Sequence, residues 1–149
     1  MEVVQAASQR HMILATLHGP AVSLSVVAVW AMRGPRGYAG AVIGGLDALL
    51  PLTAASPNVF VAGDFNASPV FDPTSPPALR FAEISSRLQD AGLVSLWHDR
   101  AGEAFGSESC ATYHHQWKQE QPFHIDFAFA SKALAARCRH FEIGKFDSD

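Results

Sequence analysis

The sequence lacks an excess of positive charge. Its 149 residues include 11 lysine and arginine residues against 14 aspartate and glutamate residues, so the formal net charge is −3. A protein that binds a nucleic-acid polymer mainly through its phosphates needs a basic surface, which this balance does not supply. The composition therefore argues against strong electrostatic attraction to long DNA or RNA, and it leaves small phosphate esters open as ligands.

Cysteine and long apolar runs are also scarce. The two cysteines, Cys110 and Cys138, are too few for a disulfide framework and are expected to be free thiols. Residues 1–10 lack the apolar core of a signal peptide. The longest apolar run, residues 24–32, is interrupted by Ser25 and is too short to span a bilayer. These absences predict a soluble protein with no membrane partner, for which the cytoplasm is the default compartment.

What remains is the composition of a globular domain, 48% hydrophobic and 17% charged. Short β-branched runs predict strands, and apolar residues spaced three or four apart predict helices. We expect strands at residues 12–17, 24–32, 58–62, 111–114, 124–131 and 139–143. We expect helices at residues 38–52, 76–91 and 132–138, with a long loop after residue 92. Strands and helices mixed over one core predict a single layered α/β domain.

The first candidate site follows an apolar strand, in the run Gly63-Asp64-Phe65-Asn66. Side chains alternate along an extended chain, so Asp64 and Asn66 are expected on one side and Phe65 in the core. A carboxylate can orient or deprotonate an attacking water, and a carboxamide can donate a hydrogen bond to a phosphoryl oxygen. The alternative is a plain turn after the strand, because aspartate and asparagine both favour turns.

The second candidate site is the run His124-Ile125-Asp126 at the start of a predicted strand. Ile125 and Phe127 are expected on one face of this strand, and His124 and Asp126 on the other. A carboxylate beside a histidine can hold the imidazole in one tautomer and stabilise its charged form. The alternative is an ion pair on the surface of the protein.

Gly-Asp-Phe-Asn after an apolar strand, followed about sixty residues later by His-Ile-Asp, resembles the endonuclease/exonuclease/phosphatase superfamily. Residues 24–30, 111–113 and 129–134 resemble other parts of the same pattern. The resemblance implies a mixed α/β fold of the DNase I type, a four-layer α/β sandwich in which two sheets pack together. It also implies metal-dependent, nuclease-like hydrolysis of a phosphodiester, with Mg²⁺ or Mn²⁺ as the cofactor.

The resemblance also implies roles for individual residues. Asp64 and Asn66 would lie at the scissile phosphate, Asp126 would orient a catalytic histidine, and His124 would bind the substrate. The substrate would be a phosphodiester, of which nucleic acid is one form. The metal ligands stay unassigned, because the principal ligand of the family is a glutamate that the pattern of this chain does not include.

The chain also departs from the family pattern. It lacks the asparagine and the Gln-Glu pair of the N-terminal half, and it ends at Phe146-Asp147-Ser148-Asp149 where the family continues through a Ser-Asp-His strand. We therefore expect residues 1–149 to form a partial domain that lacks the N-terminal half and this last strand. Two alternatives stay open, namely an inactive fragment or binding remnant and a phosphomonoesterase of the same superfamily.

A partial domain of this kind would leave one face of its sheet without a partner. The expected result is an exposed apolar patch and a poorly soluble or molten chain. The sequence does not decide which residues of each strand point to that face. The candidates are Val26, Val29, Phe60, Ala62, Phe127 and Phe129.

Overall fold

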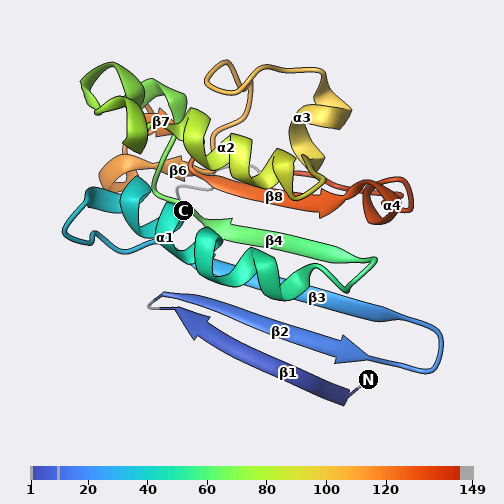
Figure 1. Ribbon diagram of the computed structural model, residues 1–149. Coiled ribbons are helices and arrows are strands. Elements are labelled where there is room, and N and C mark those ends of the chain that lie inside the picture. The colour runs from blue at the N-terminus through green and yellow to red at the C-terminus, as the bar shows by residue number, and fades with distance from the viewer. Residues whose placement is uncertain (1, 10, 145–149) are drawn as a thin grey trace.

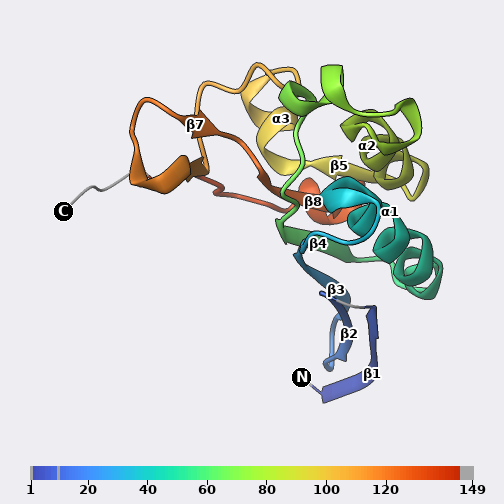
Figure 2. The same cartoon turned by 90° about the vertical axis from the view of Figure 1, so that its left-hand side faces the viewer.

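The computed structural model describes residues 2–9 and 11–144. In this part of the chain six strands form one sheet in the order β1-β2-β3-β4-β8-β5 (Figure 1, with β5 labelled in Figure 2). They are β1 (Glu2–Gln9), β2 (Met12–His18), β3 (Ser23–Trp30), β4 (Val59–Asp64), β5 (Leu93–Ser95) and β8 (Asp126–Ser131). A separate hairpin pairs β6 (Tyr113–His114) with β7 (Pro122–Phe123). The predicted mixed α/β fold is confirmed.

The sheet combines antiparallel and parallel pairs. β1, β2 and β3 form an antiparallel meander, β3 and β4 are parallel, and β8 is antiparallel to both β4 and β5. The parallel step requires a crossover, which α1 (Gly37–Leu49) and the 3-10 helix η1 (Leu50–Thr53) provide. β4 is therefore a central strand, and its last residue, Asp64, lies between β3 and β8.

Helices cover one face of the sheet. α1 and α2 (Phe81–Asp90) lie side by side on the same side of it (Figure 2). Their apolar faces share a core with buried strand residues that include Leu14, Val27 and Val61. Gly45 of α1 lies so close to Met12 that a β-carbon would overlap the methionine side chain. This contact explains why a residue that weakens helices occupies the middle of α1.

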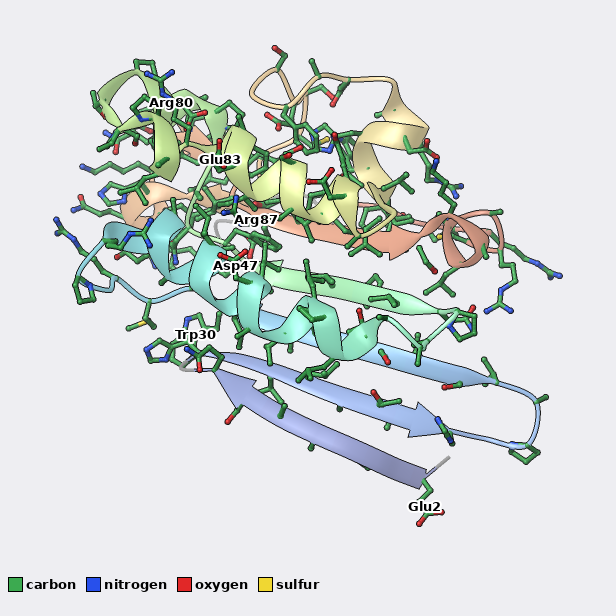
Figure 3. The ribbon with its side chains drawn as sticks, in the orientation of Figure 1. Glu2, Trp30, Asp47, Arg80, Glu83 and Arg87 are labelled. Carbon is green, nitrogen blue, oxygen red and sulfur yellow. The ribbon has the colours of Figure 1, made fainter. Side chains whose placement is uncertain are left out.

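An ion-pair network joins the two helices on their outer side. Arg87 of α2 lies 2.7 Å from Asp47 of α1 and 3.0 Å from Glu83 of its own helix (Figure 3). All three side chains are partly exposed to solvent. Exposed pairs of this kind contribute about 0.2 to 1 kcal/mol, so the core stabilises the helix pair more than these charges do.

Among the residues that the structure describes, no helix lies on the opposite face of the sheet. Residues paired directly across strands point to the same face, and one row runs through Ile13, Ala28, Ala62 and Ala128. Ile13 is 56% exposed, and Trp30, which lies on the same face, is 62% exposed. The face is thus apolar and open to solvent over β2 and β3, and we call it the open face.

The strand register decides which candidate residues belong to the open face. Among these six candidates, the side chains that point under the helices are buried, and those of the open face are partly exposed. The open face carries Val26, Phe60 and Ala62, and the helix-covered face carries Val29, Phe127 and Phe129.

Apart from the 3-10 helices, four of the described elements were not predicted. They are β1, β5, β7 and α3 (Leu96–Ala101). β5 has three residues and α3 has six, so neither is long enough to show a repeating apolar pattern. β1 has two valines followed by polar and small residues, without a sustained apolar alternation, and it pairs with β2 through its backbone. Segment 97–99, predicted as part of a loop, belongs to α3.

A predicted strand is absent, and the second predicted helix begins later than expected. Residues 139–143 form no strand, because Arg100 binds the carbonyl oxygens of Cys138 at 2.7 Å and Arg139 at 3.2 Å in place of a neighbouring strand. The second helix begins at Phe81, where Asp72 Oδ1 accepts the backbone N–H at 2.7 Å. The 3-10 turns η2 (Pro69–Thr74) and η3 (Pro77–Leu79) precede it.

The remaining elements are short. The predicted helical turn at residues 132–138 is present as α4 (Lys132–Ala135), and η4 (His115–Trp117) lies between β6 and β7. In the described ranges, no helix has the length and apolar character needed to cross a membrane.

Candidate active site

β4 ends in a glycine and an aspartate that lie against β3. Gly63 has a φ of 139°, and a β-carbon there would overlap the backbone of Val29. Only glycine permits this approach of the two strands. The backbone carbonyl of Asp64 accepts the N–H of Ala31 at 2.7 Å. The backbone from which the Asp64 side chain projects is therefore fixed on the β3 side.

Phe65 anchors the next step of the chain. Its side chain is fully buried, with its ring 5.5 Å from that of Phe127 and 6.0 Å from that of Phe129. Its backbone N–H donates to the carbonyl of Ile125 at 2.9 Å. Because Phe65 points into the core, its two neighbours point the other way, as the alternation predicted.

Asn66 holds the side chain of Asp64. Its backbone N–H donates to Asp64 Oδ1 at 2.8 Å, and its Nδ2 donates to Asp64 Oδ2 at 2.7 Å and to the carbonyl of Ala31 at 3.0 Å. Asn66 has a φ of 46°, a left-handed conformation that asparagine tolerates better than most residues. The turn given as the alternative interpretation is present, and it orients both oxygens of Asp64.

β8 places Asp126 directly opposite Asp64. The two residues are paired across the antiparallel strands, and Trp30, labelled in Figure 3, continues the row on β3. Thr112 holds this end of β8, because its Oγ1 accepts the backbone N–H of Ile125 at 3.1 Å and that of Asp126 at 3.0 Å. The two sequence motifs therefore meet on the open face.

Both carboxyl groups are harder to ionise than a free aspartate. Burial raises the pKa of Asp64 and the nearby Asp126 raises it further, while the hydrogen bonds from Asn66 act in the opposite direction. Burial likewise raises the pKa of Asp126, against the lowering effects of Thr112 and His124. Carboxylates in such surroundings are good proton acceptors once ionised, and they attract cations.

His124 is buried, so the interpretation as a surface ion pair is wrong for this residue. It is 6% exposed, and its Nδ1 donates to the carbonyl of Cys110 at 2.8 Å. His124 also precedes β8, which begins at Asp126. The side chains of His124 and Asp126 nevertheless line one hollow of about 160 Å³.

A buried polar chain that the sequence did not reveal lies behind His124. Ser95 Oγ is 2.7 Å from His98 Nδ1, and His98 Nε2 is 3.1 Å from Glu108 Oε1. The ring of His98 lies 5.7 Å from that of His124. Burial lowers the pKa of His98, and Glu108 opposes that shift. No local pattern could have indicated this chain, because His98 and Glu108 belong to different elements.

Asp64 and Asp126 are the acidic pair of this site. Within residues 2–9 and 11–144, no three histidine, cysteine, aspartate or glutamate side chains gather in an arrangement that could hold a metal ion. Asp149, the last residue of the segment after which a Ser-Asp-His strand was expected, lies outside the described residues.

The sequence matches the Endonuclease/Exonuclease/phosphatase family over residues 10–149. The chain belongs to this family. No curated protein matches it. The resemblance carried by the Gly-Asp-Phe-Asn and His-Ile-Asp motifs is thereby confirmed.

Solved structures share the fold. The 3′-5′ exonuclease NExo from Neisseria meningitidis is 19% identical, with a TM-score of 0.59 over 86% of this chain and 55% of NExo. A variant of the Neisseria 3′ phosphatase NExo, bound to a product DNA hairpin, is 18% identical, with a TM-score of 0.59 over 87% and 55%. The endonuclease domain of TRAS1, a telomere-specific non-LTR retrotransposon, is 11% identical, with a TM-score of 0.59 over 87% and 54%. The chain spans about half the length of these proteins.

Proposed function

We propose that the chain belongs to a metal-dependent phosphodiester hydrolase of the nuclease type, with Asp64, Asn66 and Asp126 as its catalytic residues. The observation that supports this best is the pairing of Asp64 with Asp126 across β4 and β8, with Asn66 bonded to both oxygens of Asp64. An oriented carboxylate pair on an accessible sheet face suits phosphoryl transfer in a family of nucleases and phosphatases.

In the proposed reaction, a water attacks phosphorus in line with the leaving oxygen. Asp64 accepts a proton from this water as the new P–O bond forms, and the old P–O bond breaks to release an alcohol that takes a proton from solvent. The side-chain N–H groups of Asn66 are used on Asp64 and Ala31, so its proposed role is to orient Asp64.

The two carboxylates fit a hard divalent cation, Mg²⁺ or Mn²⁺. Both are partly buried, and a bound cation would relieve the cost of ionising them there. Such ions prefer oxygen ligands and often keep several waters, so the two carboxylates would form part of the protein's contribution to the metal site. When bound, the ion would stabilise negative charge on the phosphoryl oxygens.

His124 is proposed to bind substrate. Its position beside Asp126 in the 160 Å³ hollow, and the effect of its charge on the pKa of Asp126, support an electrostatic link between them. With Nδ1 held by the carbonyl of Cys110, Nε2 is the ring nitrogen left to contact the substrate.

We also propose that residues 1–149 are a partial domain and that the chain alone is inactive. The open face exposes Ile13 and Trp30, and a second sheet packed on it would produce the four-layer sandwich that the family resemblance implies. That layer would also supply the glutamate ligand. Without it, the chain would be a remnant that binds and does not turn over.

A phosphomonoesterase is a second candidate. It is favoured by the likeness to NExo, which is described as a 3′ phosphatase in a complex with a product DNA hairpin. The same carboxylates would then act on a terminal phosphate. Nucleic acid is accordingly the first substrate to test in either case.

Mn²⁺ binding by this chain and three variants tests the proposed pair. We expect Asp64→Asn and Asp126→Asn each to weaken binding by about tenfold or more, because each removes a charged ligand. Asp99→Asn, which changes an exposed acid on α3, is the matched control and should bind as the wild type does. Equal Mn²⁺ affinity in all four proteins would show that the pair is not the metal site.

Hydrolysis of bis-p-nitrophenyl phosphate separates the catalytic proposal from the partial-domain proposal. A partial domain should give no Mg²⁺-dependent turnover above that of the buffer. Robust turnover that Asp64→Ala abolishes would support the catalytic role of Asp64 and contradict the partial domain.

A further inference from the structure

We infer that a cavity beside Asn66 binds a nucleobase, so that the site accepts a nucleotide in preference to a plain sugar phosphate. The inference rests on the proposed function, because it assigns the group attached to the phosphate on which Asp64 and Asp126 would act. None of the residues proposed for catalysis requires this preference.

The cavity has a volume of about 680 Å³ and lies between three segments of the chain. Its lining comes from the start of α1, from residues 66–81, which include η2 and η3, and from the hairpin β6–β7. Asn66 and Ile125, which each adjoin a catalytic carboxylate in the site, also line it. The volume falls within the range of roughly 300 to 1,000 Å³ that is typical of small-molecule sites.

Aromatic side chains from separate segments form its walls. Tyr38 is 39% exposed, Phe71 is 39% exposed and Tyr113 is 40% exposed, and all three line the cavity. The ring of Phe71 lies 5.4 Å from that of Phe123, which pairs with Tyr113 across the hairpin. Half-exposed rings gathered around one hollow offer stacking surfaces for a flat ligand.

The charges around the cavity suit an anion. Arg36 lines it together with the first residues of α1, a helix that has no side-chain cap and no acidic residue in its first turn. The positive end of this helix dipole and the guanidinium therefore act in the same direction. The acidic residue of the lining, Asp72, accepts the backbone N–H of Phe81 at 2.7 Å. An anionic ligand with an aromatic ring matches this combination.

Ser68 adds a hydrogen-bonding group that the protein itself does not use. It lines the cavity and is 2% exposed, and its Oγ has no hydrogen-bond partner among the described residues. Buried hydroxyl groups are normally hydrogen-bonded, so an acceptor on a base or ribose would complete this one. With stacking walls, a cation and this hydroxyl together, the ligand class is a nucleoside monophosphate.

Calorimetric titration of the 149-residue chain with AMP, in EDTA and without metal, tests the inference. We expect AMP to bind at least about tenfold more tightly than ribose 5-phosphate, because stacking supplies the difference. Phe71→Ala and Tyr113→Ala should each weaken AMP binding about tenfold. Trp117→Ala, which removes an 81% exposed aromatic from the segment between β6 and β7, is the matched control and should have no effect.

Two further variants guard against loss of folding. Tyr113→Phe keeps the ring and should keep AMP binding. Ser68→Ala breaks no protein hydrogen bond, so it should weaken AMP binding and leave the far-UV circular dichroism unchanged. If Phe71→Ala or Tyr113→Ala unfolds, AMP binding by Tyr113→Phe and Ser68→Ala tests the inference instead.

The inference is overturned if AMP and ribose 5-phosphate bind equally, or if AMP binding does not respond to Phe71, Tyr113 and Ser68. The outcome is independent of catalysis, because the titration uses no metal and no turnover. If these variants weaken AMP binding but Mn²⁺ binding does not depend on Asp64, the nucleobase cavity is supported and the proposed function is rejected. If Mn²⁺ binding depends on Asp64 but AMP does not bind, the proposed function is supported and the nucleobase cavity is rejected.

Discussion

The two faces of the sheet differ in what they contribute. The face under α1 and α2 is a closed core in which Phe65, Phe127 and Phe129 contact one another through their rings. The open face, made by the alternate residues of the same strands, carries exposed apolar groups and the pair Asp64 and Asp126. Folding and proposed chemistry are thus separated by the alternation of side chains along each strand, and changes on the two faces should have different effects.

The largest expected effect is on the helix-covered face. Phe65→Ala should lower the free energy of unfolding by about 3 to 5 kcal/mol, because it leaves a cavity among packed rings. Ile13→Ala, on the open face, should lower it by no more than about 0.5 kcal/mol. Urea denaturation measures both values. Equal losses at the two positions would contradict the division between the faces.

The next effect concerns association through the open face. The wild-type chain should bind the dye ANS and associate as its concentration rises, because Ile13 and Trp30 are exposed there. The double variant Ile13→Lys, Trp30→Lys should scatter less light and bind less dye. Leu52→Lys, a change at a 44% exposed residue of η1, is the control and should alter neither. A wild-type chain that is monomeric and binds no dye would exclude this role for the face.

A smaller effect should appear in the pH dependence of stability. The pKa of Asp126 is raised in the folded state. At pH values between its pKa in the unfolded state, about 3.9, and its higher pKa in the folded state, the folded protein binds more protons than the unfolded protein does. Stability therefore falls as pH rises through this interval. Asp126→Asn should be more stable than the wild type at pH 7, and the gain should vanish below pH about 3.9. Thermal unfolding at both pH values checks the sign, and a variant less stable at pH 7 would contradict it.

The smallest effect is expected on the outer side of the helices. Arg87→Ala should lower the free energy of unfolding by only about 0.2 to 1 kcal/mol, because its ion pairs with Asp47 and Glu83 are exposed. The loss should shrink in about 1 M salt, which screens such charges. A salt-independent loss would mean that the arginine stem contributes through packing instead.

Local patterns in the sequence predicted much of this arrangement. The alternation at residues 64–66 correctly placed Phe65 in the core with Asp64 and Asn66 on the other side, because it depends only on the geometry of an extended chain. The main strands and helices that flank the motifs were predicted from β-branched runs and from the spacing of apolar residues. The convergence of Asp64 and Asp126, which are paired across β4 and β8, was expected because each motif places its polar pair on one face of a strand end.

Contacts between distant segments could not be predicted in this way. Thr112 holds the backbone of Asp126 from 14 residues away, and His124 is turned into the protein by the carbonyl of Cys110. The use of the Asn66 amide on Asp64 depends on a left-handed backbone conformation that no periodicity indicates. Each of these features is set by tertiary contacts, which the sequence pattern does not record.

The most direct measurement of the central claim is paramagnetic broadening of backbone amide signals by Mn²⁺ in a ¹H–¹⁵N spectrum. Signals of Asp64, Asn66 and Asp126 should broaden first, while those of Asp47 and Asp99, which are exposed acids elsewhere on the molecule, should persist. Asp126→Asn should remove the selective broadening. Broadening that begins at Asp47 or Asp99, and leaves the Asp64 signal sharp, would show that the open-face carboxylates do not hold the metal.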